Sequence, residues 1–433
     1  MNNKVVKNAS WIIGARILQS IMSFFIGMLT ARYLGPSNYG LISYAASITA
    51  FLVPFMQLGL NNILVQQFID FPDKEGVILG SSLAANLISA FLCILGIITF
   101  CFLTAPSEIE TIIVCSLYSL ILVFQALELF HYWFQAHYLA KYPSIISLIV
   151  YVIVASYKAF LLITGKSIYW FAVSNALDYC LISIGLIIIY KKLGGKKLEY
   201  SFSEFKRMFS SSRYYIISSL MVTIFAQTDK IMLKFMLGTE STGYYSVAAT
   251  CASMTSFIFV AILDSYRPLV FESKKEGIER FELNMERLYS VIFYFSLIQC
   301  IFIALCSRWI ILIIYGTKYA PAIDALRIIV WYTTFSYLGS VRNIWMLAEG
   351  KQKFLWIINL SGALFNVVLN FFLIQLWGVN GAAIASLATQ LFTNVFIGYI
   401  IKPIRDNNRL MIKGLNPIYC VDIIKSVLKR RSR

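Results

Sequence analysis

Charge is what this sequence has least of. Only 13% of its 433 residues are charged and 59% are hydrophobic, whereas a soluble domain has about 25% charged and about 45–50% apolar residues. Apolar runs of about 20 residues, the length that a helix needs to cross a bilayer, recur along the whole chain. The composition excludes a soluble globular protein and predicts an integral membrane protein.

The spacings typical of metal sites and disulfides are also missing. The eight cysteines lie in or beside apolar segments without CxxC spacing, so we expect packing residues. The two histidines, His131 and His137, have no neighbouring constellation of Cys or Glu that would complete a zinc site. We therefore expect neither a metal nor a bound cofactor.

Twelve segments have the length and composition of a membrane span. They cover residues 9–33, 39–68, 78–103, 109–131, 143–164, 167–190, 210–237, 243–270, 287–315, 321–347, 353–376 and 380–401. Pro54 falls inside the second segment and should kink its helix. The sequence predicts an all-α polytopic membrane protein with about 12 transmembrane helices.

Lys and Arg are distributed unevenly over the two sides of the predicted membrane. Of 37 such residues, 28 lie in or beside segments on the side of both termini, 5 lie on the other side and 4 lie within spans. The positive-inside rule then places both termini in the cytoplasm. The net charge of +16 needs no nucleic acid, because basic inner segments such as 191–197 can lie against anionic lipid headgroups.

A short repeat links the two halves of the chain. Residues 31–48 and 234–251 share six identities in 18 positions. Six spans separate the copies, so both halves enter the membrane in the same direction, as in a parallel repeat; a generic helical hairpin is the alternative. The predicted organisation is an N-terminal six-helix bundle (1–195), a cytoplasmic linker (196–213), a C-terminal six-helix bundle (214–405) and a basic cytoplasmic tail (406–433).

Three motifs give the chain a family resemblance: ARYLGPSNYG (31–40), TDKIMLKFMLGTESTGYYSVA (228–248) and IYGTKYAPAIDALRI (314–328). Together they resemble the polysaccharide transporters, the Wzx-type flippases of O-antigen and capsule repeat units, in the multidrug/oligosaccharidyl-lipid/polysaccharide exporter superfamily. The resemblance implies two bundles forming a V around a central cavity. It also implies export of oligosaccharides linked to polyprenyl diphosphate, in a bacterial or archaeal cytoplasmic membrane, alongside membrane lipids and other polysaccharide assembly proteins.

Two other functions remain as alternatives. One is another exporter of the superfamily: a peptidoglycan-lipid flippase, which usually has fourteen spans, or a drug or metabolite antiporter, for which a cationic drug would favour an acidic cavity. The other is a membrane-embedded glycan polymerase. Such an enzyme generally needs a substantial extramembrane loop with catalytic groups, whereas the outer loops here are short, so we do not expect an enzyme.

Ionisable residues within spans are costly unless they face a cavity or a partner, so each is a candidate site residue. Arg16 could hold the diphosphate with its planar fork or snorkel to the headgroups. Lys158, Asp229 and Lys230 are the other candidates for the substrate cavity. Asp229 and Lys230 are adjacent and point about 100° apart, so at least one must face elsewhere.

The remaining intramembrane charges have other expected roles. Asp178 is the candidate for coupling to a proton or sodium gradient, and a cross-helix pair with Lys158 is its alternative. Two pairs at i, i+3 spacing are expected to be local structural ion pairs; they are Asp264 with Arg267 and Asp324 with Arg327.

Overall fold

The computed structural model describes the backbone of residues 3–419 and the side chains of residues 18, 19 and 22–419. This part of the chain is helical, without a β-strand. It forms two compact units that join inside one long helix, between Ile231 and Met232. The predicted bundle boundaries at residues 195 and 214 stay a prediction.

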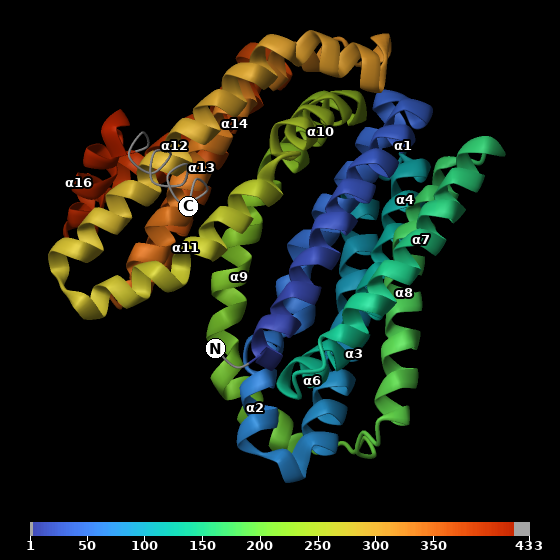
Figure 1. The fold of residues 1–433 in the computed structure, drawn as a ribbon. Helices are drawn as coiled ribbons and strands as arrows, with labels where there is room; N and C mark the ends of the chain where they lie inside the picture. Colours follow the sequence, from blue (N-terminus) through green and yellow to red (C-terminus); the bar gives the residue numbers. More distant parts are fainter. Residues whose placement is uncertain (1–2, 420–433) are drawn as a thin grey trace. The chain divides into compact units, whose positions relative to one another are not determined.

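Unit 1, which extends to Ile231, is a bundle of long helices with short ones at one end (Figure 1). Its helices are α1 (Asn3–Gln57), α2 (Leu64–Asp70), α3 (Glu75–Thr104), α4 (Ile109–Ser119), α5 (Ile121–Leu127), α6 (Phe130–Ala136), α7 (Lys141–Ile163), α8 (Ile168–Lys192) and most of α9 (Phe202–Leu237). Helix α1 packs against α3, α4 and α7, and α8 packs against α4, α5 and α7. Buried aliphatic and aromatic side chains fill the space between them.

Unit 2 is organised around α13, which packs against α10, α12 and α14. Its helices are α10 (Thr239–Ser253), α11 (Ser256–Glu276), α12 (Ile278–Trp309), α13 (Ala322–Ala348), α14 (Leu355–Leu391), α15 (Ile397–Ile400) and α16 (Arg405–Gly414). Two π-helical segments, η3 (Ile310–Tyr315) and η6 (Phe392–Phe396), continue α12 and α14. Short 3₁₀ turns complete both units: η1 (Leu60–Asn62), η2 (Pro72–Lys74), η4 (Thr317–Tyr319), η5 (Gln352–Phe354) and η7 (Lys402–Ile404).

The helices confirm a polytopic all-α membrane protein. Within the described residues, eight helical stretches are long and apolar enough to cross a membrane, or nine if α10 and α11 form one span bent by 41°. The stretch Gln352–Ile400 has 49 residues, about twice what one crossing needs, and breaks at Gly378. Helix α1 breaks in the same way at Gly35. These two breaks fall between predicted spans, at residues 33–39 and 376–380; the total of twelve spans stays a prediction.

The sequence repeat corresponds to a repeat in the backbone. Gly35 has φ 75° and ψ 172°, and Gly238 has φ 90° and ψ −178°. Residues with a side chain rarely adopt this region, so glycine is needed at both corners. The two copies of the motif therefore make the same sharp corner between consecutive helices.

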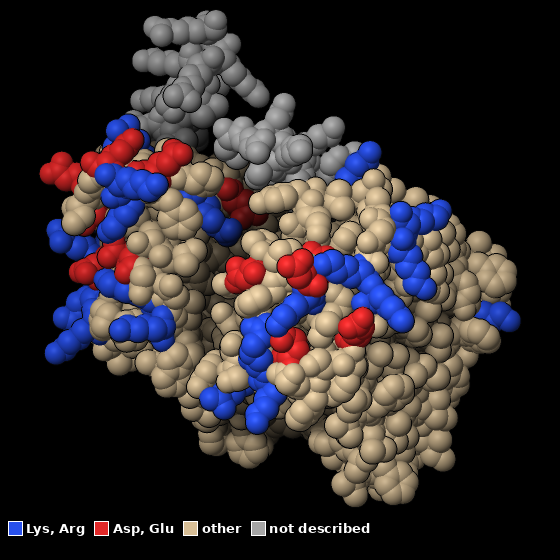
Figure 2. Space-filling model, turned by 90° about the horizontal axis from the view of Figure 1, so that it is seen from below, with Lys and Arg blue, Asp and Glu red and all other residues tan. Residues whose placement is uncertain are grey.

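Charged side chains gather at the end of unit 1 where α3 begins, which Figure 2 views directly. The segment between α8 and α9 lies along the first turns of α3. The Glu199 amide donates to the Gly76 carbonyl (3.2 Å), and the Ser201 amide donates to Ser81 Oγ (2.9 Å). A Cβ on Gly76 or Gly80 would overlap this segment. The linker is thereby fixed to unit 1 just before α9 begins.

Candidate functional site: a polar cleft in unit 1

The first turns of α9 are anchored to the turn that follows α1 and to α2. Ser212 Oγ donates to the Leu58 carbonyl (2.8 Å), and Arg207 Nη2 donates to Gln67 Oε1 (2.6 Å). Gly59, at φ 69°, lies so close to the Ser212 carbonyl that a Cβ would overlap it. These contacts set how closely α1 and α9 approach at this end.

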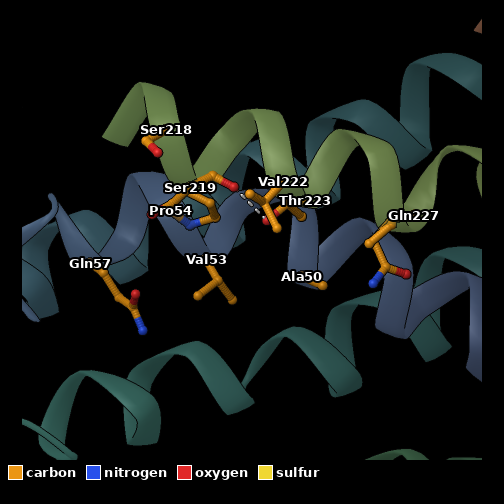
Figure 3. A pocket seen from close by; sticks show the side chains of 10 residues that line it. Ala50, Val53, Pro54, Gln57, Ser218, Ser219, Val222, Thr223 and Gln227 are labelled. Carbon is orange, nitrogen blue, oxygen red and sulfur yellow. Dashed lines mark hydrogen bonds between the residues drawn. The ribbon is translucent and has the colours of Figure 1, made fainter. Parts of the chain in front are cut away.

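Beyond this anchor, a cleft of about 420 Å³ opens between α1 and α9. Its walls are Ala50, Val53, Pro54 and Gln57 on α1 and Ser218, Ser219, Val222, Thr223, Ala226 and Gln227 on α9. The spacing of three, four and seven residues on α1 places its four wall residues on one helix face. Figure 3 shows Gln57 and Gln227 at opposite ends of the cleft. We call this site the α1–α9 cleft.

The hydrogen-bonding groups of the cleft are only partly used within the protein. Thr223 Oγ1 donates to the Ser219 carbonyl (3.0 Å), and Gln57 Oε1 accepts a hydrogen bond from Asn61 Nδ2 (2.9 Å). Within the described residues, the Gln227 amide, the Gln57 Nε2 group and the hydroxyls of Ser218 and Ser219 have no protein partner. A ligand or water can therefore bind to both donors and acceptors here.

The walls of the cleft carry no charge, and most of their side chains are too small to fill the space between α1 and α9. None of the ten lining side chains is ionisable, and most are small. Pro54 has no backbone N–H, so the Ala50 carbonyl lacks its usual helical donor. The cleft lies within two candidate membrane spans, Met22–Gln57 and Phe202–Leu237. Polar side chains at such positions are favourable only where they line a cavity.

A second polar site in unit 1 is charged. Lys158 on α7 donates from Nζ to Asn175 Oδ1 on α8 (2.9 Å) and lies within electrostatic range of Asp178. Glu128, between α5 and α6, lies near Asp178 as well. Asp178 Oδ1 is buried and has no hydrogen-bond partner in the described part. We call these four residues the Lys158 cluster. Lys158 and Asp178 influence each other electrostatically, but the direct partner of the Lys158 ammonium is Asn175, so the cross-helix ion pair stays a prediction.

The other predicted substrate residues lie on the two helices that form the cleft. Arg16 belongs to α1, but its side chain lies outside the described residues. Asp229 on α9 is buried and lies next to half-buried Lys230, with which it interacts electrostatically. Both residues follow Gln227, the last cleft residue of α9, within one helical turn.

The two predicted local ion pairs have the expected geometry. The guanidinium of Arg267 lies 3.2 Å from Asp264 on α11, and that of Arg327 lies 3.0 Å from Asp324 on α13. Arg327 Nε also donates to Ser307 Oγ on α12 (3.0 Å). All four carboxylate and guanidinium side chains are largely exposed, so these pairs lie on the surface of unit 2.

Sequence reasoning missed two intramembrane charges. Glu128 falls inside the fourth predicted span and should have been a candidate on the same grounds as Asp178. Arg342 falls inside the predicted span 321–347 but was not among the candidates; it is 5% exposed within α13. Its Nη1 donates to the Thr393 carbonyl in π-helical η6 (2.6 Å). A π-helix shifts the regular hydrogen-bond pattern, so Arg342 satisfies a carbonyl that no sequence periodicity reveals.

The neutral cleft residues were missed for a different reason. Ser, Thr and Gln are uncharged and did not stand out individually, and only the facing of α1 and α9 brings this set together. Cysteine and histidine add nothing to the site: within residues 3–419 no three His, Cys, Asp or Glu side chains gather as a metal site.

Comparison with solved structures identifies proteins with a similar fold. The chain matches the lipid II flippase MurJ in its inward closed conformation with a TM-score of 0.70 and 16% identity, covering 95% of this chain and 92% of that one. It matches an inward-facing multidrug resistance MATE family transporter of the MOP superfamily with a TM-score of 0.68 and 12% identity, covering 91% and 96%. At these identities the likeness shows the fold alone.

Sequence relatives point to polysaccharide assembly. The chain is 22% identical to the capsular polysaccharide biosynthesis protein CapF of Staphylococcus aureus, covering 92% of this chain and all of that one. It is 21% identical to a putative O-antigen transporter of Escherichia coli (strain K12), covering 90% and 95%. Residues 5–274, more than half of the sequence, match the family model described as "Polysaccharide biosynthesis protein". The chain therefore belongs to the polysaccharide biosynthesis protein family, which confirms the resemblance found in its motifs.

Proposed function

We propose that this protein is a flippase that moves oligosaccharide repeat units linked to polyprenyl diphosphate from the cytoplasmic to the outer leaflet, for assembly of a surface polysaccharide. The observation that carries the proposal is the α1–α9 cleft: an uncharged wall with unused hydrogen-bonding groups inside two candidate membrane spans. A hydrated glycan needs such a wall to enter the membrane, because unpaired polar groups are costly in hydrocarbon.

The three parts of the substrate need different surroundings. The polyprenyl tail can stay in lipid, and the glycan can contact the cleft. The diphosphate needs cations, and α1 and α9 supply candidates in Arg16 and Lys230. A guanidinium binds phosphate oxygens through two parallel hydrogen bonds. The two helices of the cleft thus carry groups for both polar parts of the substrate.

Names of similar proteins support the same reading. One relative is called a capsular polysaccharide biosynthesis protein, another a putative O-antigen transporter, and a protein of similar fold is a lipid II flippase. All three names concern lipid-linked or surface glycans. An exporter mechanism by alternating access, rather than polymerase chemistry, fits a site without paired catalytic groups in its walls.

The membrane potential favours the proposed direction. A negative interior contributes about 2.3 kcal/mol per charge per 100 mV to moving an anion outward. Two diphosphate charges would gain roughly 4–5 kcal/mol at 100 mV if they crossed the whole field. Coupling to an inward proton or sodium ion is a further part of the proposal, with Asp178 as its carrier and Glu128 beside it.

The proposed sidedness can be checked with reporter fusions. We place both termini in the cytoplasm of a bacterial or archaeal cytoplasmic membrane. A reporter at residue 200 should then be cytoplasmic and one at residue 105 external. An external reporter at residue 200 would contradict this orientation.

The function is tested by filling the cleft. Ala226→Phe places a ring in the α1–α9 cleft, and Ile217→Phe places the same ring on an exposed position of α9 outside it. In cells that lack their own repeat-unit exporter, with membrane levels matched, Ala226→Phe should reduce surface glycan at least tenfold and Ile217→Phe should not. Equal amounts of surface glycan in the two variants would show that the substrate does not pass through the cleft.

The diphosphate contact is tested separately at Arg16. Arg16→Ala removes a charge-assisted contact worth about 1.5–3 kcal/mol, so substrate capture should weaken roughly tenfold or more. Arg16→Lys should recover part, because an ammonium keeps the charge but loses the fork. Arg16→Glu should be worst. Normal export by well-inserted Arg16→Glu protein would show that Arg16 does not bind the diphosphate and would favour the alternative that it snorkels to the headgroups.

A further inference from the structure

We propose that the α1–α9 cleft is a subsite for an uncharged sugar ring of the transported glycan, and that it selects against sugars carrying a carboxylate. This inference rests on the proposed function and adds a substrate preference to it. It assigns the selecting groups to α9 and to the end of α1, apart from the cations expected to hold the diphosphate.

The size of the cleft suits a short stretch of glycan. About 420 Å³ lies toward the lower end of the range of small-molecule sites, about 300–1,000 Å³. The space exists because Ala50, Ser219 and Ala226 are small where the helices face each other. Larger side chains at these positions would close it. The cleft therefore accommodates part of a repeat unit, with the remainder outside.

The unused hydrogen-bonding groups match sugar hydroxyls. A hydroxyl group both donates and accepts, and the cleft offers both functions: the Gln227 amide, the Gln57 Nε2 donor and the hydroxyls of Ser218 and Ser219. Gln57 and Gln227 lie at opposite ends (Figure 3). An apolar ligand would leave these groups unpaired as it displaced water, which is unfavourable. The wall thus distinguishes a polar ligand from a lipid tail or an apolar drug.

Because its walls contain no ionisable residue, the cleft favours an uncharged ligand. Transfer of a carboxylate from water into a site without a cation is strongly unfavourable, far more than transfer of a hydroxyl that finds a partner. None of the ten wall residues can supply that cation. Phosphate recognition is excluded on the same grounds. A neutral hydroxyl-rich ring is the ligand class that satisfies the wall.

Thr223 is the position at which this selectivity can be changed. It lies on the α9 wall between Ser219 and Gln227, and its hydroxyl already donates to the protein backbone. Thr223→Lys would add an ammonium to the cleft. Ser211→Lys adds the same charge to an exposed position of α9 that does not line the cleft, and so serves as the matched control.

The experiment measures binding by the full chain in lipid nanodiscs. The two probes are synthetic farnesyl-diphosphate disaccharides of equal length, one of N-acetylglucosamine only and one ending in glucuronic acid. The wild-type chain should bind the neutral probe at least tenfold more tightly. Thr223→Lys should reduce or reverse this ratio, and Ser211→Lys should leave it unchanged. Gln227→Leu should weaken binding of the neutral probe more than binding of the acidic probe.

The outcomes separate the two proposals. Equal affinity of the wild-type chain for both probes, or an unchanged ratio in Thr223→Lys protein, would overturn the neutral subsite while leaving glycan transport standing. Failure of the wild-type chain to bind either probe would overturn both proposals. Farnesyl diphosphate without sugar serves as a reference, and equal binding of this reference and the neutral probe would show that the cleft makes no sugar contact.

Discussion

The two polar regions of unit 1 differ in how their side chains are satisfied. In the Lys158 cluster, the Lys158 ammonium binds Asn175 across two helices and lies near Asp178. In the α1–α9 cleft, amide and hydroxyl groups such as those of Gln227 and Ser219 keep unused hydrogen-bonding capacity and no charge is present. In one region, charged groups of the protein lie near one another; in the other, neutral polar groups stay available to a ligand.

This difference suggests a division of roles. A cluster of charged groups loses stability when one partner is removed and can respond to ions, because adding or removing one charge changes its balance. A neutral open wall contributes little to stability and can respond to a glycan. Mutations in the Lys158 cluster should therefore change stability or ion dependence, whereas mutations in the α1–α9 cleft should change glycan binding.

The largest expected effect is loss of stability on removing the Lys158 ammonium. Lys158→Met leaves Asp178 and Glu128 without their cation, and breaking a buried pair costs up to about 3–5 kcal/mol, less for a half-buried one such as this. Thermal unfolding of the purified chain in nanodiscs should show a clear decrease. The double variant Lys158→Met/Asp178→Asn should recover much of it. Additive losses in the double variant would show that the two residues do not interact.

The second effect concerns the ion dependence of transport. If Asp178 carries a coupled proton or sodium ion, Asp178→Asn should abolish stimulation of transport by an ion gradient while leaving binding of a lipid-linked glycan measurable. Glu128→Gln should reduce the same stimulation, because its carboxylate lies near Asp178. Unchanged ion dependence in both variants would return the carboxylates to a structural role.

The smallest expected effect is on stability when the cleft is changed. Gln227→Leu removes an amide without a protein partner, so the free energy of unfolding should change by less than about 0.5 kcal/mol. Its binding of a neutral glycan should nevertheless decrease. Unfolding in nanodiscs, compared directly with Lys158→Met, measures the contrast. A stability loss as large as that of Lys158→Met would mean that the cleft is part of the packed core.

Much of the fold follows from local rules that the sequence contains. The apolar runs predicted the helices because backbone groups in hydrocarbon must be satisfied within a helix. The sequence repeat has glycine at matching positions, and Gly35 and Gly238 make equivalent corners because only glycine readily adopts their positive φ. The break at Gly378 falls between the last two predicted spans, residues 353–376 and 380–401, although no polar loop separates them.

The candidate site was less predictable because it depends on how helices face each other. Lys158 and Asp178 are 20 residues apart and stood out individually as charges, so their pairing could be offered as an alternative. Gln57 and Gln227 are 170 residues apart and uncharged, and no periodicity connects them. Arg342 did not stand out, because a basic residue near the end of a predicted span resembles one at the membrane surface, whereas the structure buries it.

Direct measurement of flipping tests the central claim. The purified chain is placed in liposomes that carry a fluorescent lipid-diphosphate disaccharide of N-acetylglucosamine, and a membrane-impermeant reagent reports the labelled lipid in the outer leaflet. We predict that the wild-type chain and Ile217→Phe protein equilibrate or export the lipid much faster than protein-free liposomes, whereas Ala226→Phe protein is at least tenfold slower. Movement by the wild-type chain no faster than in protein-free liposomes, with correctly folded protein and with an imposed ion gradient, would contradict the account.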